Sequence, residues 1–252
     1  MVDLKGKVAV VAGGARDIGR AVSLELARAG ADIAFCYPPH ENQEEAKQTE
    51  AEAKKLGRKV LAIPVNGMST AEVNAFIADV GETFGRVDVL VNVVGGLCGR
   101  KKLEEMDEAF WDFVIDLNLK STWRMTKAVL PLLPDGAAIV NFASQAGRDG
   151  GGPGSLAYAT AKGGVMTFTR GLAKELGPRK IRVNAVTPGM IDTTFHNTFT
   201  KPEVRQKVAS MTPLGREGEA CEVAKLVAYL ASDEASFVNG ANVDINGGVL
   251  FS

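Results

Sequence analysis

The 252-residue sequence is poor in cysteine and histidine, and neither occurs in a metal-binding pattern. Its three cysteines, Cys36, Cys98 and Cys221, are far apart and form no CxxC pair, so the sequence predicts neither a disulfide framework nor a structural zinc site. With only two histidines, His40 and His196, a histidine-rich metal centre is excluded as well. We therefore expect chemistry that needs no bound metal ion.

Long apolar runs and an excess of charge of one sign are also absent. No apolar run reaches the roughly 18–20 residues of a membrane span, and the first seven residues lack the apolar segment of a signal peptide. The 29 basic and 30 acidic residues give a net charge of −1, whereas binding to nucleic acid favours a basic excess. We therefore expect a cytoplasmic protein whose partners include neither a membrane nor a nucleic acid.

Short apolar runs alternate with longer amphipathic stretches along the whole sequence. The apolar runs predict strands at 8–12, 33–37, 60–65, 87–91, 138–142, 181–186 and 242–245. The amphipathic stretches predict helices at 18–29, 44–56, 69–84, 107–132, 155–176 and 219–231. Strands that are apolar on both faces and alternate with helices predict an α/β fold with a Rossmann-like, doubly wound parallel sheet of about seven strands. Without a linker or repeat, we expect a single domain over residues 1–252.

The stretch from Met190 to Gly218 breaks this alternation. At about 29 residues it is too long for a plain connection between two elements. Loops of this length are often lids over binding sites. We expect residues 190–218 to form a substrate loop or lid.

Glycines cluster directly after the first predicted strand, where the next helix begins. In residues 13–19, GGARDIG, they let the backbone approach a phosphate, and the helix N-terminus favours an anion. The strand–turn–helix context favours a pyrophosphate-binding turn over an ordinary glycine-rich turn. The residues that we expect to bind the phosphates of a dinucleotide are Gly13, Ala15, Arg16, Ile18 and Gly19.

The end of the second predicted strand bears on the choice between NAD and NADP. An acidic residue there would bind the ribose 2′-hydroxyl of NAD and repel the 2′-phosphate of NADP. Residues 35–38 contain no acid, the next one is Glu41, and Arg16 can pair with a phosphate. We expect Tyr37 to contact the cofactor and NADP(H) to be preferred, with NAD(H) also usable.

Four polar residues are candidates for the chemistry. Tyr158 and Lys162 lie one turn apart on a predicted helix, and Ser144 follows a predicted strand at the sheet edge where ligands bind. Asn118 lies in an otherwise apolar helical stretch, where an amide needs partners. Lowering a phenol pKa from about 10 to about 7 takes roughly 4 kcal/mol, more than an exposed lysine supplies. The tyrosine–lysine pair must therefore lie in a desolvated cleft.

These four residues resemble the Asn–Ser–Tyr–Lys tetrad of the classical short-chain dehydrogenases/reductases, and the resemblance spans nearly the whole chain. Residues 12–19 resemble the family's T-G-x-x-x-G-x-G motif, with Ala12 in place of Thr and Asp17 in place of the middle Gly. Residues 92–95 resemble its N-N-A-G element. By this resemblance the further cofactor-binding residues are Asn92, Gly95, Tyr158, Lys162, Pro188, Gly189 and Thr193.

The resemblance implies an oxidoreductase that moves a hydride between NAD(P)H and a carbonyl or hydroxyl, as a carbonyl reductase does. It implies that Tyr158 exchanges a proton with the substrate oxygen and that Lys162 lowers the tyrosine pKa and binds the nicotinamide ribose. Ser144 would orient the carbonyl, and Asn118 would hold a water that links Lys162 to solvent. The resemblance also implies a homotetramer, formed by the apolar stripe Phe110, Phe113, Val114 and Phe168.

Cations in the loops expected around the substrate predict a small polar, anionic substrate. We expect Arg100, Arg148 and His196 to bind it, with arginine as the better partner of a carboxylate. Three segments are similar to loops of bacterial reductases of 4-deoxy-L-erythro-5-hexoseulose uronate, which implies a sugar-derived keto-uronate. The segments are 95–100, 148–152 and 188–196.

Two other functions share these features. A 3-oxoacyl-thioester reductase has the same tetrad but would want an apolar or carrier-facing lid, whereas residues 195–207 are mixed in character. A non-catalytic NADPH-binding sensor or scaffold is compatible with the altered Asp17 and with Val93-Val94, although the complete tetrad argues against it. NADPH consumption with a panel of carbonyl compounds distinguishes the three.

Overall fold

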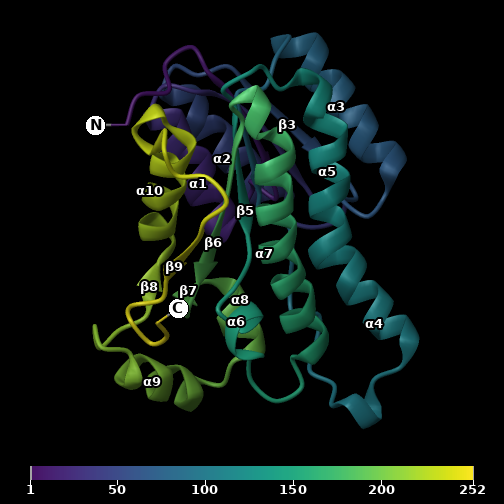
Figure 1. Cartoon of the computed structure of the whole chain (residues 1–252), viewed down its shortest axis with the longest axis vertical. Coiled ribbons are helices and arrows are strands. Elements are labelled where there is room, and N and C mark those ends of the chain that lie inside the picture. Colours follow the sequence, from purple (N-terminus) through teal and green to yellow (C-terminus); the bar gives the residue numbers. More distant parts are fainter. Residues whose placement is uncertain (1, 252) are drawn as a thin grey trace.

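Seven parallel strands form the centre of the structure, in the order β3-β2-β1-β4-β5-β6-β9 (Figure 1). The structure is a computed structural model that describes residues 2–251, apart from the side chain of Phe195. The strands are β1 (Val8–Ala12), β2 (Asp32–Tyr37), β3 (Val60–Pro64), β4 (Val89–Asn92), β5 (Ala138–Phe142), β6 (Arg182–Pro188) and β9 (Asn242–Ile245). Because β1, β4 and β5 are buried along their whole length, they can be apolar on both faces.

Helices cover both faces of this sheet. One apolar core lies between the sheet and α1 (Asp17–Arg28), α2 (Gln43–Lys55) and α10 (Ala220–Ala231). The other lies between the sheet and α3 (Thr70–Phe84), α5 (Ser121–Val129) and α7 (Leu156–Leu176). Figure 1 shows α1 and α10 on one side of the strands and α3, α5 and α7 on the other. The predicted doubly wound, Rossmann-like sheet is confirmed.

The strand order reverses direction at β1, and this reversal positions the site. Strand β1 pairs with β2 on one side and with β4 on the other, so that Ala12 lies opposite both Cys36 and Asn92. The loops that follow these strands therefore diverge at the carboxyl end of β1. Such a switch point leaves a crevice in which α/β proteins bind ligands.

The helix expected over residues 107–132 is divided. Helix α4 (Glu108–Ile115) is followed by a π-helical turn, η2 (Asp116–Lys120), by α5, and by a 3-10 turn, η3 (Leu130–Leu132). Asn118 lies within the π turn and donates a 3.0 Å hydrogen bond to the carbonyl of Val114. Single π turns inside helices occur mostly at functional sites.

The 190–218 segment has regular structure where the sequence predicted only a loop. It contains β7 (Ile191–Asp192), α8 (Thr194–Phe199) and α9 (Pro202–Met211), and β8 (Gly218–Glu219) follows and pairs with β7. Figure 1 shows α8, α9 and the short helix α6 (Ala146–Asp149) at the same end of the sheet. In the part of the chain that the structure describes, no helix combines the length and apolar character needed to cross a membrane.

Candidate active site

The glycine-rich segment forms a tight turn between β1 and α1. The N–H groups of Gly13 and Gly14 donate to the carbonyl of Cys36 at 3.0 and 3.1 Å. A Cβ on Gly19 would lie 1.8 Å from the carbonyl oxygen of Gly13, and a Cβ on Gly14 would lie 2.5 Å from Cβ of Phe35. Only glycine fits these two positions, so the turn packs closely against the start of α1, where an anion is favoured.

The other residues predicted to bind phosphates lie in different surroundings. Ala15 is buried, and its carbonyl accepts a 2.9 Å hydrogen bond from Thr49. Ile18 is half-buried in the first turn of α1. Arg16 donates a 2.7 Å hydrogen bond to Thr194 at the start of α8, and it does not line the cavity that contains Tyr37. Arg16 therefore faces the 190–218 segment, which the sequence did not reveal.

A cavity of about 150 Å³ lies over the carboxyl ends of β1, β2 and β4. Asn92 lines it and donates from Nδ2 to Thr126 at 3.1 Å and to Asn141 at 2.9 Å, while its buried Oδ1 has no hydrogen-bond partner within residues 2–251. An unpaired buried acceptor costs free energy, so this atom marks a place for a hydrogen-bond donor. Tyr37 lines the same cavity, and no Asp or Glu is among the described lining residues. The residues therefore fit the adenosine part of a dinucleotide.

Three of the four predicted catalytic residues, Ser144, Tyr158 and Lys162, come together where β5 ends and α7 begins. Lys162 is buried, donates a 2.8 Å hydrogen bond to the carbonyl of Phe142, and has Nζ 5.8 Å from the centre of the Tyr158 ring. The side chain of Tyr158 is hydrogen-bonded to Ser144. The Ser144 hydroxyl also accepts from the N–H of Ala146 at 3.2 Å. These contacts place a phenol, a hydroxyl and an ammonium within one cluster.

Burial acts on both titrating groups of this cluster. It lowers the pKa of Lys162 to about 8. It also raises the pKa of Tyr158 above its ordinary value, and the hydrogen bond from Ser144 opposes that rise only in part. The protein without cofactor therefore does not hold an acidic tyrosine, because desolvation outweighs the hydrogen bond from Ser144. At neutral pH the site holds a neutral phenol that can donate a proton.

Asn118 lies behind the cluster and fixes the turn that follows β4. Its Oδ1 accepts from the N–H of Gly96 at 2.9 Å, and its Nδ2 donates to the carbonyl of the same residue at 2.9 Å. A Cβ on Gly95 would lie 2.6 Å from Oδ1 of Asn118 and 2.9 Å from Nζ of Lys162. All four predicted catalytic residues therefore lie in one region, and Asn118 contacts it through the backbone of residues 95–96.

The turn after β6 lies beside this cluster. The N–H of Gln145, next to Ser144, donates to the carbonyl of Pro188 at 3.1 Å. The N–H of Gly189 donates to Ile245 at 3.0 Å, and Thr193 is buried with its hydroxyl bonded to the carbonyl of Ile191 at 3.1 Å. Pro188 and Gly189 are thus held next to the loop that carries Ser144.

Arg148 has a different environment from the one that we expected. Its guanidinium donates to the carboxylate of Asp244 at 2.7 Å and to the carbonyl of Asn242 at 2.6 Å, both on β9. A guanidinium that is already paired with a carboxylate and a carbonyl gains little from a substrate anion. In the structure Arg148 thus joins α6 to β9, and a substrate contact by this residue stays a prediction.

Arg100 and His196 are the other predicted substrate residues. Arg100 is exposed and donates a 3.0 Å hydrogen bond to the carbonyl of Pro153, just before α7. His196 is on α8, with Nδ1 3.0 Å from the hydroxyl of Thr200. Burial lowers the pKa of His196, and the charge of Glu217 opposes this shift only in part. The imidazole is therefore uncharged at neutral pH and offers hydrogen bonds, whereas we had counted it among the cations.

Cys98 is a residue of the site that sequence reasoning missed. Its backbone has the left-handed φ of 60°, and its thiol lies 3.4 Å from the carbonyl of Gly96. It is close enough to Tyr158 for its charged form to raise the tyrosine pKa. The only signal was its place six residues after the end of β4. Within residues 2–251 no group of three or more His, Cys, Asp or Glu side chains could hold a metal ion.

Comparisons with known proteins agree with this geometry. The family model described as enoyl-(acyl carrier protein) reductase matches residues 13–250. The chain is 37% identical over 245 residues to the 3-oxoacyl-[acyl-carrier-protein] reductase FabG of Staphylococcus aureus, which covers 96% of this chain and 98% of the relative. It is 38% identical over 250 residues to FabG of Thermotoga maritima, covering 98% of this chain and 99% of the relative.

Solved structures share the fold over the whole chain. Carveol dehydrogenase from Mycobacterium avium, in complex with NAD, has a TM-score of 0.93 at 30% identity and covers 100% of both chains. A blue fluorescent protein from a metagenomic library, in complex with NADPH, has a TM-score of 0.92 at 32% identity, covering 99% of this chain and 100% of the other. A short-chain dehydrogenase from Burkholderia cenocepacia, in complex with NADP, has a TM-score of 0.91 at 32% identity, covering 98% of both chains.

Three observations indicate the same family. They are the match of the family model, the identity to curated reductases, and the cluster of a phenol, a hydroxyl and an ammonium. The chain belongs to the short-chain dehydrogenase/reductase family of NAD(P)-dependent oxidoreductases.

Proposed function

We propose that the protein reduces a carbonyl group with NADPH. The observation that carries this proposal is the cluster of Ser144, Tyr158 and Lys162 at the same sheet edge as the glycine-rich turn. The absence of an acid among the described residues lining the cavity near Tyr37 supports the phosphorylated cofactor. Solved relatives in complex with NADPH and NADP support the same choice, and the relative in complex with NAD keeps NAD(H) as a usable cofactor.

Each residue of the cluster has a role that follows from its contacts. The bound cofactor supplies the hydride. Tyr158, a neutral phenol in the cofactor-free protein, gives its proton to the substrate oxygen, and the Ser144 hydroxyl holds that oxygen by a hydrogen bond. Lys162 carries its charge beside the ring and stabilises the phenolate that remains. Asn118 keeps residues 95–96 against Lys162.

Different residues at the carboxyl ends of the strands would hold the adenosine, the phosphates and the nicotinamide of the cofactor. We assign the adenosine half to Tyr37 and Asn92, which line the cavity. We assign the phosphates to the turn at residues 13–19, where the N-terminus of α1 favours an anion. The nicotinamide half falls to the residues next to the cluster, which are Gly95, Tyr158, Lys162, Pro188, Gly189 and Thr193.

The substrate of the proposed reaction has two candidates. A 3-oxoacyl thioester is favoured by the relatives, since both curated proteins described above are 3-oxoacyl-[acyl-carrier-protein] reductases. A small anionic keto acid, such as a sugar-derived uronate, is favoured by the exposed Arg100 near His196. Because Arg148 is paired with Asp244, Arg100 is the one predicted arginine still available to an anionic substrate, so we rank the thioester first. In either case the 190–218 segment would act as the lid.

The experiment that tests the proposal is the oxidation of NADPH and of NADH with a panel of carbonyl compounds. The panel contains a 3-oxoacyl thioester, a keto-uronate and neutral aldehydes. We expect turnover with a lower KM for NADPH than for NADH. Binding of NADPH without turnover of any compound would instead indicate a sensor or scaffold. Arg100→Ala separates the substrates, because it should raise KM for the uronate and leave that for the neutral aldehydes unchanged.

A homotetramer formed through the helices after β4 and β5 remains a proposal. Phe113 on α4 and Trp123 on α5 are 44% and 42% exposed, and these large apolar side chains support a contact surface. Val114, which we had placed in the same stripe, is fully buried inside the subunit and cannot contribute. Light scattering on the purified protein measures the number of subunits.

A further inference from the structure

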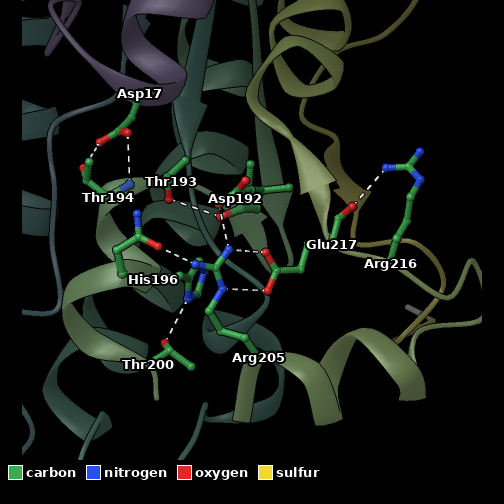
Figure 2. A network of polar contacts seen from close by, with 11 residues as sticks. Asp17, Asp192, Thr193, Thr194, His196, Thr200, Arg205, Arg216 and Glu217 are labelled. Carbon is green, nitrogen blue, oxygen red and sulfur yellow. Dashed lines mark hydrogen bonds and ion pairs between the residues drawn. The ribbon is translucent and has the colours of Figure 1, made fainter. Parts of the chain in front are cut away.

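Asp17 links the glycine-rich turn to the 190–218 segment (Figure 2). Its Oδ1 accepts a 3.1 Å hydrogen bond from the N–H of Thr194, the first residue of α8, and its Oδ2 accepts from the hydroxyl of the same threonine. Arg16 donates to that hydroxyl at 2.7 Å, and its guanidinium lies 3.5 Å from Oδ2 of Asp17. Two neighbouring residues of the turn are thus tied to one residue 177 positions after Asp17.

The backbone of Asp17 explains how an acid can stand at this position. Its φ is 50°, in the left-handed region that glycine adopts freely and that Asp and Asn adopt more readily than other residues. Asp17 therefore keeps the conformation of the turn and adds a side chain that reaches α8. The same argument shows that Asn and Gly can replace it without strain in the turn.

The 190–218 segment is itself held together by Arg205, on α9 (Figure 2). Its Nε donates to Glu217 at 2.7 Å, and its Nη2 donates to Glu217 and to Asp192 of β7, the latter at 2.7 Å. Its Nη1 donates to Asn197 of α8. One guanidinium thus joins α8, α9, β7 and the residue before β8, so the start of α8 is coupled to the rest of the segment.

The charge of Asp17 would be unfavourable beside a pyrophosphate if it were free. In the structure its two oxygens are occupied by Thr194, and the guanidinium of Arg16 is close enough to offset its charge. A carboxylate that is hydrogen-bonded and paired in this way repels a second anion less than an isolated one does. The acid in the turn is therefore compatible with the proposed cofactor as long as the contact to α8 is made.

We propose that Asp17 is a positioning residue, which holds the 190–218 segment against the phosphate-binding turn. The contact couples the two sites, because the turn that receives the cofactor phosphates also fixes the start of the lid. The proposal rests on the proposed function only in taking the 190–218 segment as a lid over the substrate site. The contact itself is a property of the protein without ligands.

Hydrogen exchange of the cofactor-free protein tests the contact directly. Asp17→Gly removes both acceptors, Asp17→Asn keeps one oxygen for the Thr194 N–H, and Thr194→Val removes only the hydroxyl. We expect amides of residues 194–211 to exchange roughly tenfold faster in Asp17→Gly, because this variant loses hydrogen bonds to a charged group. The effect should be smaller in Asp17→Asn. The matched control is Glu203→Gln, an exposed acid in the first turn of α9, which should leave exchange unchanged.

A double-mutant cycle identifies the partner. Because Asp17 and Thr194 share a contact, the effect of Asp17→Gly combined with Thr194→Val on exchange should be smaller than the sum of the two single effects, and only the hydrogen bond from Arg16 to Thr194 adds to the loss. With a substrate found by the carbonyl panel, Asp17→Gly should raise the substrate KM by roughly three- to tenfold and change kcat by less than about twofold. Asp17→Asn should restore part of the loss, which a defect of the turn alone would not allow.

The outcomes separate this inference from the proposed function. Unchanged exchange in Asp17→Gly, or additive effects in the double variant, would overturn the positioning role whether or not the protein turns over a substrate. If exchange responds as expected and no carbonyl compound is reduced, the positioning role stands and the proposed function fails. If Asp17→Gly lowers kcat and leaves KM unchanged, the residue acts on the chemistry and the positioning role is wrong.

Discussion

The ammonium of Lys162 donates a 2.8 Å hydrogen bond to the carbonyl oxygen of Phe142, the last residue of β5. This contact fixes the ammonium from the strand side, with Nζ 5.8 Å from the ring centre of Tyr158. The lysine is buried, and burial is the cause of its lowered pKa. A charge held in a desolvated place acts strongly on a neighbouring phenolate, because the local dielectric constant is low.

Replacement of Tyr158 by Phe should abolish proton transfer and leave the fold intact. The variant loses the phenolic oxygen that is hydrogen-bonded to Ser144, while the ring beside Lys162 remains. We expect kcat to fall by at least about 10²-fold, the range for loss of a general acid, with an unchanged dissociation constant for NADPH. Steady-state kinetics measures kcat, and fluorescence titration measures the dissociation constant for NADPH. Tyr229→Phe, on α10, is the control, and near-normal turnover of Tyr158→Phe would disprove the assignment.

Replacement of Lys162 by Met should stabilise the cofactor-free protein at neutral pH. A shift of the lysine pKa from 10.5 to about 8 means that the folded state bears the cost of a buried charge, up to about 3 kcal/mol. Methionine removes this charge, although it leaves the carbonyl of Phe142 without its donor. We expect a higher free energy of unfolding in urea at pH 7 and a large loss of kcat in the same variant.

The sign of the pH dependence follows from proton binding. Between pH 8 and 10.5 the lysine is protonated in the unfolded chain and largely neutral in the folded one, so the stability of the parent rises with pH. Below pH 8 it is charged in both states and the full cost of burial applies. The advantage of Lys162→Met should therefore shrink as the pH rises from 8 toward 10.5. A pH-independent difference between variant and parent would contradict this account.

Two adjacent glycines provide a matched pair for testing the turn after β4. A Cβ on Gly95 would lie 2.6 Å from Oδ1 of Asn118 and 2.9 Å from Nζ of Lys162, whereas a Cβ on Gly96 meets nothing within 4 Å. Gly95→Ala should displace both side chains and lower kcat/KM by roughly 10²-fold, since small displacements of reacting groups are costly. Gly96→Ala should retain activity. Equal activity of the two variants would show that the turn tolerates the displacement.

Replacement of Arg205 by Ala should loosen the 190–218 segment. Arg205 joins Asp192, Asn197 and Glu217, so its loss should speed exchange of the α8 and α9 amides and raise the substrate KM. Arg205→Lys should not restore KM, because one ammonium cannot replace the planar fork. Arg216→Ala is the control from the same segment, since Arg216 pairs with the half-exposed Glu222 at the surface. A full rescue by lysine would show that only the charge matters.

The sequence predicted the sheet and its covering helices because their patterns are local. Strand 8–12 was expected and observed with the same bounds, since a run of buried β-branched residues has few alternatives. The π turn at residues 116–120 could not be predicted, because the amide of Asn118 stabilises it through Gly96, 22 residues away. Helix α9 had a detectable signal, Pro202 followed by apolar residues at helical spacing, which the overall polarity of the segment obscured.

Candidate site residues could be predicted from the sequence where their motif lies within one helix or at the end of one strand. Tyr158 and Lys162 share a helix, so their spacing alone brings them together. The partner of Arg148 is 96 residues away, and that of Arg16 is 178 residues away, so the direction of each guanidinium depends on tertiary packing. The same holds for the tyrosine pKa, because the sequence predicted a desolvated cleft but not that burial would outweigh the hydrogen bond from Ser144.

The π turn also determines how this protein could lose its activity without losing its fold. Deleting one residue from Asp116–Lys120 would convert the bulge into continuous α-helix, a repair that backbone hydrogen bonding favours. Each residue of a helix turns the chain by about 100°, so the amide of Asn118 would swing away from Gly96. The shorter and more regular helix would thus make the fold more stable and leave the site inactive.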